Sequence, residues 1–436
     1  MVDDLCIGCT HCMSVCPTEA IRIRDGKAVI LEDRCVDCGN CCKACPVSAI
    51  LIEQDDFEDV FRRPVRIALL PSVLIGQFPS RIKTEEIYGA LRHLGFTHVF
   101  EIDSVVDVVQ EGYNHFLRDH EGERPLISTF CPAIVRLIQV RFPAMVDQLV
   151  RVKPPSDIAA IYFRRKLEAQ GHAPEDIGVF YVTPCAAKIT SIKSPVGEEQ
   201  SAVTGVINMQ FLYNKLLHLI LNKESGTAEM SAMVQLSSKG ILWSLTRGEA
   251  EHQEGRGLAV DGIRNVTEFL ERLEESEECN IDFLELRACD ESCAGGVLIS
   301  GNRFLTVDRL NRRAEELRSE DRANGVDEHF DPEMHGLSPI PPRSMLVVDQ
   351  DRQVAIQKIR QVEDMLKVLP GIDCGACGSP SCRVLAEDVV QGRSTLNACV
   401  FLQEIQLRDG RLSHFEADEI NASIWGKDRG YRSQRK

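Results

Sequence analysis

The sequence predicts a multidomain protein that combines α/β and α+β parts. With 436 residues the chain is too long for one simple core, so we expect two to four domains. Most of its 18 cysteines gather near the two ends, whereas the long segment between them alternates predicted strands with helices. We therefore expect a cysteine-rich domain at each end and a body of parallel sheets covered by helices.

The middle of the chain justifies the expectation of parallel sheets. Apolar runs predict buried strands at residues 65–70, 99–102, 177–182 and 283–286. Residues 84–96 predict an amphipathic helix that stops at a glycine. Ligand groups on such sheets usually lie on loops at strand ends. The loops that contain Pro132, Pro184 and residues 289–296 follow such ends and are candidate sites.

Four segments follow from these patterns: residues 1–57, the body at 58–310, a linker at 311–345 and a late cysteine domain at 346–436. The linker is indicated by a charged stretch and then the proline-rich residues 337–342, since such segments resist both helix and sheet. In the last segment, residues 349–366 have helical spacing, and residues 400–436 form a polar tail.

Composition narrows the class of protein. A formal charge of −16 argues against binding to nucleic acid, which needs clustered lysine and arginine, and it suits a partner with a basic docking face. No apolar run reaches the roughly 18 residues of a membrane span. The N-terminus lacks the pattern of a secretory signal. Tight CxxC spacing in a long chain does not suggest a disulfide framework, so we expect a cytoplasmic protein.

Eight cysteines near the N-terminus repeat one pattern, CxxCxxCxxxCP, which ends at Pro17 and again at Pro46. In this spacing one loop supplies three thiolates to an iron–sulfur cube and the other repeat supplies the fourth. The predicted ligands are Cys6, Cys9, Cys12 and Cys45 for one [4Fe–4S] cluster, and Cys35, Cys38, Cys41 and Cys16 for the other. Zinc is the alternative, although zinc sites use separate CxxC pairs. Residues 1–50 resemble bacterial two-cluster ferredoxins, and we expect Cys42 to be a small buried filler.

Four late cysteines are spaced so that they could enclose one cofactor: Cys374, Cys377, Cys382 and Cys399. Gly375 and Gly378 let the loop fold tightly, and backbone N–H groups there can donate to cluster sulfurs. Together with residues 386–389, this segment resembles the small single-cluster domain of Rnf-type electron-transport subunits and corrinoid iron–sulfur proteins. The resemblance implies one [4Fe–4S] cluster, with zinc again as the alternative.

The body holds four cysteines that lie far apart in the sequence: Cys131, Cys185, Cys289 and Cys293. Their contexts at 129–133, 183–188 and 288–296 resemble the three signature loops of the [FeFe]-hydrogenase H-cluster domain, over roughly residues 60–305. The resemblance implies a [4Fe–4S] cube on these cysteines, with Cys293 also bridging to a two-iron subsite that bears CO, cyanide and a dithiolate amine. It also implies that Lys188 binds a cyanide. A surface lysine or a structural salt bridge is the alternative for Lys188.

Four positions depart from the usual loops of that family. Phe130 replaces a cysteine that relays protons, and a phenyl ring has no exchangeable proton. Thr183 and Arg287 replace methionines, and Ser191 replaces a relay glutamate. A positioned acid or base is worth roughly 10²–10⁴-fold in rate, so H₂ turnover by the usual route should fall at least that far. Either Phe130 packs in a site with another proton route, or the site keeps only its cube.

These patterns predict three to four [4Fe–4S] clusters in series, and hence a hydrogenase-like electron-transfer subunit of a larger redox complex. No GxGxxG fingerprint stands out, so flavin or NAD sites are expected on partner subunits, with ferredoxin-type proteins as further partners. A low-turnover [FeFe]-hydrogenase and an H₂ sensor with a diiron H-cluster are the alternatives. Cys279 fits no ligand pattern.

Overall fold

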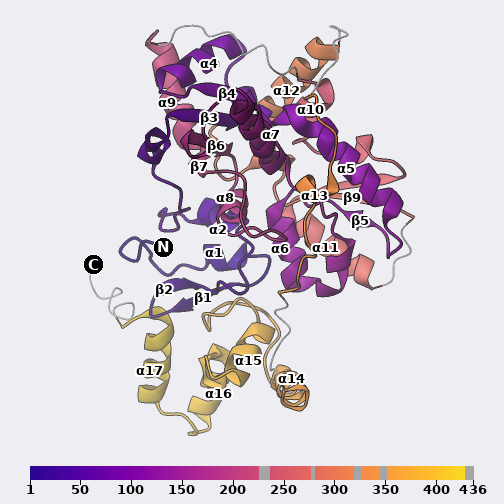
Figure 1. The fold of residues 1–436 in the computed structure, drawn as a ribbon. Coiled ribbons are helices and arrows are strands. Elements are labelled where there is room, and N and C mark those ends of the chain that lie inside the picture. Colours follow the sequence, from indigo (N-terminus) through magenta and orange to yellow (C-terminus); the bar gives the residue numbers. More distant parts are fainter. Residues whose placement is uncertain (225–235, 276–279, 319–325, 344–350, 428–436) are drawn as a thin grey trace. The chain divides into compact units, whose positions relative to one another are not determined.

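The computed structural model describes residues 1–224, 236–275, 280–318, 326–343 and 351–427, so Cys279 lies outside the described residues. The chain forms two compact units (Figure 1). Met1–Ile52 and Arg343–Lys436 make up the first unit, and Glu53–Pro342 makes up the second. The first unit therefore combines two segments that are far apart in the sequence.

The N-terminal segment of the first unit is built on an antiparallel hairpin of β1 (Ile21–Arg24) and β2 (Lys27–Ile30). Asp25 and Gly26 form its turn with φ of 47° and 70°, the left-handed conformation that a tight two-residue hairpin requires. The short helices α1 (His11–Ser14) and α2 (Asn40–Ala44) precede and follow the hairpin in the chain.

The C-terminal segment of the first unit is helical, as the sequence predicts. Its elements are α14 (Arg352–Leu366), α15 (Cys382–Val390), η7 (Leu396–Ala398), α16 (Val400–Arg408) and α17 (His414–Trp425). The side chains of Asp351, Ser381 and Ser413 accept backbone N–H groups at the first turns of α14, α15 and α17. Such N-caps fix where each helix begins.

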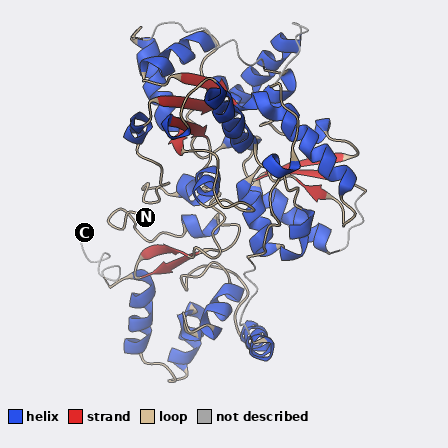
Figure 2. Ribbon diagram, in the orientation of Figure 1, coloured by secondary structure: helices blue, strands red, loops and turns tan. Residues whose placement is uncertain are grey.

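The second unit contains two separate parallel sheets, drawn in red in Figure 2. The larger sheet has the strand order β4-β3-β6-β7, and the smaller has the order β5-β9-β8. The strands are β3 (Val65–Leu70), β4 (His98–Glu101), β5 (Leu126–Ile127), β6 (Ile177–Thr183), β7 (Gly205–Asn208), β8 (Gly257–Asp261) and β9 (Phe283–Arg287). The parallel α/β body expected from the sequence is confirmed.

The larger sheet is buried on both faces. Ile67 and Leu69 of β3 face one apolar core, whereas Ala68 and Leu70 face another, because successive side chains of a strand alternate between faces. A strand with two buried faces reads as a continuous apolar run, which is why β3, β4 and β6 could be recognised in the sequence, whereas β7 was not predicted.

Helices connect the strands and supply the cores. The α-helices are α3 (Ser72–Gln77), α4 (Thr84–His93), α5 (Val106–Asp119), α6 (Pro132–Arg141), α7 (Pro155–Ala169), α8 (Ala186–Lys193), α9 (Met209–Leu221), α10 (Ser238–Leu242), α11 (Ile263–Glu274), α12 (Arg303–Arg318) and α13 (Pro332–His335). The short 3-10 helices are η1 (Phe57–Arg62), η2 (Ile102–Val105), η3 (Pro143–Gln148), η4 (Pro174–Asp176), η5 (Ala250–His252) and η6 (Ser292–Gly295). In the described ranges no helix combines the length and apolar character needed to cross a bilayer.

The start of the expected linker, residues 311–345, differs from the prediction. Helix α12 runs into it as far as Arg318. Thr306, Leu310 and Ala314, spaced one turn apart, are buried, and Leu310 packs against Gly76 of α3. The charged residues on the other faces of α12 mask this narrow apolar stripe in the sequence.

Candidate metal centres

The two N-terminal cysteine repeats adopt the same backbone conformation. Gly8 and Asp37 occupy matching positions with φ of 60° and 53°, and Glu19 and Ser48 do so with φ of 50° and 52°. In each repeat the last cysteine accepts a backbone N–H four residues on, at 3.2 Å for both Ala20 to Cys16 and Ala49 to Cys45. Donors of this kind stabilise negative charge on sulfur and tune the potential of a cluster.

The thiols of the two repeats are interleaved. Burial raises the pKa of Cys38, and the neighbouring thiols of Cys16, Cys41 and Cys35 raise it further. Cys16, from the first repeat, therefore lies among thiols of the second. Burial also raises the pKa of Cys12 to about 11, with Cys9 and Cys6 as the neighbouring thiols. Buried thiols of this kind ionise when a bound cation compensates their charge, so this region suits iron.

The extra thiol, Cys42, packs with the core of the first unit and is only partly buried. Desolvation and the nearby Cys45 raise the pKa of Cys42. It is therefore a packing residue at the edge of the N-terminal sites.

The late cysteines converge on one pocket. Cys374, Cys377, Cys382 and Cys399 all line one partly open pocket of about 280 Å³. Cys382 is the first residue of α15 and Cys399 is the N-cap of α16, so both face the positive end of a helix dipole. Asp373 has a φ of 47° and accepts the backbone N–H of Cys382 at 2.6 Å, which closes the loop. Four converging thiols, two of them at helix N-termini, fit an anionic [4Fe–4S] cube.

The body cysteines follow the carboxyl ends of parallel strands. Cys131 comes after β5 as the N-cap of α6, and Cys185 comes after β6 as the N-cap of α8. Cys289 and Cys293 follow β9, with Cys293 inside η6. Burial raises the pKa of Cys185 to about 11, and the nearby Cys131 and Cys293 thiols raise it further. The topology thus gathers cysteines from three separate segments, as the strand-end argument predicts.

Lys188 lies inside this site. Its exposed fraction is 8%, which contradicts the alternative of a surface lysine. The Lys188 Nζ atom lies 3.7 Å from the Cys293 Sγ atom and 4.0 Å from the centre of the Phe130 ring. The pKa of Lys188 is raised: burial opposes its charge, but Cys293, Tyr181 and Cys185 together more than compensate. Lys188 is therefore a buried cation held against a candidate cluster ligand.

The two most unusual residues of the loops, Phe130 and Arg287, contact each other. The guanidinium carbon of Arg287 lies 4.0 Å from the centre of the Phe130 ring. Because Lys188 lies at the same distance from that ring, Phe130 packs against two buried cations. Desolvated cation–π contacts can each contribute about 2 kcal/mol. We call Lys188, Phe130 and Arg287 the cation–π cluster.

Two carboxylates neutralise Arg287. Glu249 lies 2.9 Å and Glu285 3.4 Å from its guanidinium, and all three side chains are at most 2% exposed. Burial raises the pKa of Glu249 to about 7, against the opposing effect of Arg287. The Nη1 atom of Arg287 is buried without a hydrogen-bond acceptor among the described residues. An unpaired buried donor of this kind fits the sulfur atoms of a [4Fe–4S] cube, since Cys293 and Cys131 are close enough to stabilise its charge.

The other two departures are structural. The Thr183 Oγ1 atom accepts the backbone N–H of Cys185 at 3.2 Å and so shapes the turn that presents this cysteine. The Ser191 hydroxyl donates to the Lys188 carbonyl at 3.0 Å. Ser191 also lines a solvent-open pocket of about 510 Å³ that includes Asp157 and Glu198. Neither residue puts an acid beside Phe130, so these contacts do not fit the acid–base work of a diiron subsite.

Sequence reasoning missed Glu249 and Glu285. A signal for Glu285 was present, because it is a charged residue inside the apolar strand Phe283–Arg287. Its carboxylate accepts backbone N–H groups of Arg247, Glu249 and Ala250 at about 3 Å. Glu249 had no such signal, since it lies in a loop whose approach to Arg287 depends on the tertiary fold.

Three sequence families match successive parts of the chain. Residues 5–49 match the 4Fe-4S dicluster domain, residues 67–231 match the C-terminal domain of the iron only hydrogenase large subunit, and residues 369–401 match a putative Fe-S cluster family. The hydrogenase match includes Cys131, Cys185 and Lys188 and ends before Cys289 and Cys293. The chain thus carries 4Fe-4S domains, as its cysteine patterns predict.

Individual relatives agree with the family matches. The NADP-reducing hydrogenase subunit HndD of Solidesulfovibrio fructosivorans is 28% identical over 201 residues, which cover 43% of this chain and 31% of the relative. A protein of the ion-translocating oxidoreductase complex of Rhodobacter capsulatus is 50% identical over 38 residues, which cover 9% of this chain and 20% of the relative. The chain therefore spans about a third of the first relative and a fifth of the second.

A solved variant of [FeFe]-hydrogenase HydA1 from Chlamydomonas reinhardtii aligns with a TM-score of 0.49 and 14% identity, covering 67% of this chain and 97% of that chain. The family matches and the cysteine loops carry the assignment. Residues 67–231 thus form a divergent hydrogenase-like segment, similar to the C-terminal domain of the iron only hydrogenase large subunit, and 4Fe-4S sequences lie before and after it.

Proposed function

We propose that this protein is an iron–sulfur electron-transfer subunit of a hydrogenase-like redox complex, and that its body site carries a cube without proton chemistry. The four proposed ligand sets are those predicted from the sequence: Cys6, Cys9, Cys12 and Cys45; Cys35, Cys38, Cys41 and Cys16; Cys374, Cys377, Cys382 and Cys399; and Cys131, Cys185, Cys289 and Cys293. The observation that carries the proposal is the cation–π cluster of Lys188, Phe130 and Arg287.

The cation–π cluster puts fixed positive charge where the usual family loops have a proton relay. An arginine side chain stays protonated in proteins. The pKa of Arg287 is raised further, because Glu249 and Glu285 outweigh the effect of burial. Phe130 cannot exchange a proton. Two fixed cations beside Cys293 stabilise the extra negative charge of a reduced cluster, which suits electron storage. Neither cation offers a base to an incoming proton.

Partners complete the proposal. The relatives are named as parts of an NADP-reducing hydrogenase and of an ion-translocating oxidoreductase complex. We therefore place the electron donor and acceptor of this chain on other redox subunits, of flavin- or NAD-binding or ferredoxin type, in the cytoplasm. The charge of −16 favours partners with basic docking faces.

A low-turnover [FeFe]-hydrogenase or an H₂ sensor is the second candidate. The position of Lys188 favours it, because the ammonium lies 3.7 Å from Cys293, the cysteine that would bridge to a diiron unit. The family resemblance gives this lysine the role of binding a cyanide of that unit. Infrared spectroscopy distinguishes the two candidates, since only a diiron subsite brings metal-bound CO and cyanide.

The test uses the full chain, purified without oxygen after coexpression with the hydrogenase maturation proteins. We expect about 16 irons per chain, from four cubes, and no infrared bands of metal-bound CO or cyanide. Such bands would overturn the cube-only assignment in favour of the second candidate. A clearly lower iron content would overturn the four-cluster electron carrier.

A substitution adds a second test. Phe130→Cys restores the usual relay residue, and Phe180→Cys introduces a thiol at another buried phenylalanine of the body. We expect neither variant to turn over H₂ when maturation proteins are present. H₂ turnover by Phe130→Cys alone would show that the diiron unit is present and that only the relay had been missing.

A further inference from the structure

Within the first unit, the late cysteine loop is hydrogen-bonded to the N-terminal hairpin. The backbone N–H of Ile23 in β1 donates to the Gly378 carbonyl at 2.8 Å. Gly378 has a φ of 73°, and a Cβ atom there would lie 2.5 Å from the Ile23 carbonyl oxygen, so only glycine fits. At the hairpin turn, Asp25 and Gly26 donate to the carbonyls of Ser423 and Ile424 at 2.8 and 2.9 Å. The two segments are thus joined through their backbones.

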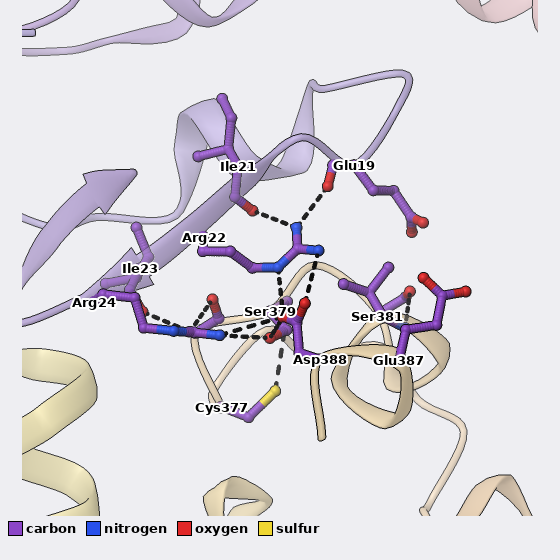
Figure 3. A network of polar contacts seen from close by, with 12 residues as sticks. Glu19, Ile21, Arg22, Ile23, Arg24, Cys377, Ser379, Ser381, Glu387 and Asp388 are labelled. Carbon is purple, nitrogen blue, oxygen red and sulfur yellow. Dashed lines mark hydrogen bonds and ion pairs between the residues drawn. The ribbon is translucent and has the colours of Figure 1, made fainter. Parts of the chain in front are cut away.

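A buried ion group reinforces this contact (Figure 3). The Asp388 carboxylate of α15 lies 2.6 Å from Arg22 and 3.3 Å from Arg24, both on β1. The Arg22 and Asp388 side chains are 3% and 2% exposed. Ser379 also donates to Asp388, at 3.2 Å, and Arg24 donates to the Gly378 carbonyl at 3.0 Å. We call Arg22, Arg24 and Asp388 the ion clamp.

The ion clamp acts on the loop that holds a candidate ligand. Cys377 directly precedes Gly378 and packs against Ser379, with its sulfur 3.8 Å from the Ser379 carbonyl (Figure 3). Burial lowers the pKa of Arg24, whereas Asp388 and the Cys377 sulfur raise it. Breaking a buried pair of this type leaves an uncompensated charge, so the geometry of the loop relative to β1 is strongly specified.

Two side chains connect the regions of the two candidate centres. Met13, next to Cys12, reaches the Cys374–Cys377 loop, since its Cε atom would lie 2.9 Å from a Cβ atom built on Gly375. The Trp425 indole N–H donates to the Ala376 carbonyl at 3.1 Å. Trp425 also packs with both apolar cores of the unit, the one around Cys12 and the one around Cys377.

We infer that the C-terminal cluster exchanges electrons directly with the N-terminal cluster that Cys12 ligates, and that Asp388 is the positioning residue for this transfer. The inference rests on the proposed function, because it requires clusters in both cysteine sets. Transfer of one electron oxidises one cluster by one unit and reduces the other by one unit, so no further reactant is needed. Electron tunnelling falls steeply with distance, and here Met13 and Trp425 bring the two loops into contact.

The first experiment measures magnetic coupling in the full chain. When both clusters are reduced they are paramagnetic, and close neighbours split or broaden each other's electron paramagnetic resonance lines. The C-terminal signal is identified as the one lost in Cys399→Ala. We expect this signal to be split in the native protein. An unsplit C-terminal signal at about 16 irons per chain would overturn the inference and leave the proposed function standing. Absence of that signal from the native protein would overturn both.

The second experiment tests the ion clamp with matched variants on one helix. Asp388→Asn removes the buried charge, whereas Glu387→Gln removes a partly exposed partner of Arg34 one residue away. We expect Asp388→Asn to lose the splitting while it retains its iron. Glu387→Gln should keep the splitting, and Asp388→Glu should restore part of it.

Two results would contradict the positioning role. If Asp388→Asn retains both its iron and its splitting, the clamp does not position the clusters. If Asp388→Asn loses the C-terminal iron, the clamp serves cluster binding instead. Trp425→Phe then gives an independent measurement of the contact, because it removes the hydrogen bond to Ala376 and keeps an aromatic ring. We expect it to weaken the splitting.

Discussion

The C-terminal cysteine pocket and the body site handle charge in different ways. In the C-terminal pocket all four cysteines come from one short segment, and the buried Asp388 pairs with Arg24 and accepts a hydrogen bond from Ser379 of the cysteine loop. In the body the cysteines come from three segments, and Lys188 lies directly against Cys293.

The two sites therefore depend on their surroundings in different ways. A local loop with helix N-termini can hold a cluster almost by itself, and buried charge then serves to attach the loop to its neighbours. A site assembled from strand ends depends on the whole sheet, and its buried cations need carboxylates such as Glu249 and Glu285 to remain stable. The body should therefore be more sensitive to changes in buried charge than to changes in local sequence.

The largest expected effect comes from Arg287→Met. This substitution leaves Glu249 and Glu285 buried without their cation, which costs about 3–5 kcal/mol of unfolding free energy. Anaerobic urea unfolding measures the loss. The double variant Arg287→Met with Glu249→Gln should recover part of it. A single variant as stable as the native chain would remove the distinction between the two regions.

Phe130→Leu should have the next largest effect. Leucine keeps an apolar group in the core but loses the ring face that two cations contact, at a cost of about 2–3 kcal/mol. Phe283→Leu shortens another fully buried ring of the same core and is the control. Urea unfolding of both variants checks the comparison. Equal losses in the two variants would mean that the cations add nothing at Phe130.

A pH titration tests the buried charge of the body at Asp103. This residue follows β4, and its carboxylate accepts a hydrogen bond from the Ser72 hydroxyl at 2.6 Å. Burial raises the pKa of Asp103 to about 7, and Glu101 raises it further; the hydrogen bonds from Ser72 and the charge of Arg313 oppose this. The unfolded chain has the ordinary pKa of about 4. Between these values the native state holds a proton that the unfolded state releases, so stability falls as pH rises through this range.

Asp103→Asn should flatten this pH dependence. From pH 5.5 to about 7 the native chain should lose about 2 kcal/mol through Asp103, whereas asparagine has no proton to release and can still accept the Ser72 hydrogen bonds. Thermal unfolding between pH 5.5 and 8 measures both slopes. Parallel slopes for the native chain and the variant would show that Asp103 is ionised throughout.

The smallest effect should come from Glu387→Gln on the C-terminal side. Its partner Arg34 lies 3.0 Å away, but the Glu387 side chain is 28% exposed, so solvent screens the pair. We expect a loss of about 0.5 kcal/mol. Urea unfolding at low and high salt measures it. If the loss were as large as that of Arg287→Met, the C-terminal pocket would depend on its ion pairs as strongly as the body site does.

Much of the fold could be predicted because its elements carry local signals. The runs at 65–70 and 177–182 correspond to β3 and β6, which are buried on both faces and therefore continuously apolar. The helix predicted at 84–96 ends at His93, and Gly95 follows with a φ of 102°. Helix α12 was missed because its buried stripe is one residue wide per turn. The expected helix at 349–366 is observed over Arg352–Leu366, and residues 349 and 350 lie outside the described residues.

Only those site residues that the cysteine spacing reveals could be predicted from the sequence. Cysteine repeats reveal ligands because one loop supplies most of a cluster, and helix-cap positions such as Cys382 and Cys399 agree with that. The contact of Phe130 with Arg287 joins the loop after β5 to the end of the neighbouring strand β9, and it needs the tertiary fold. The ion clamp joins residues more than 360 positions apart, and no local pattern marks Asp388 as the partner of Arg22.

The discontinuous first unit has a consequence for synthesis. Arg22 emerges from the ribosome early, but its partner Asp388 is made 366 residues later. At 5–20 residues per second that delay is about 20–70 s. During this interval the hairpin edge at Ile23 and the N-terminal cysteines have no C-terminal loop to pack against. The first unit therefore closes only after nearly the whole chain has been made, although its N-terminal segment is among the first parts synthesised.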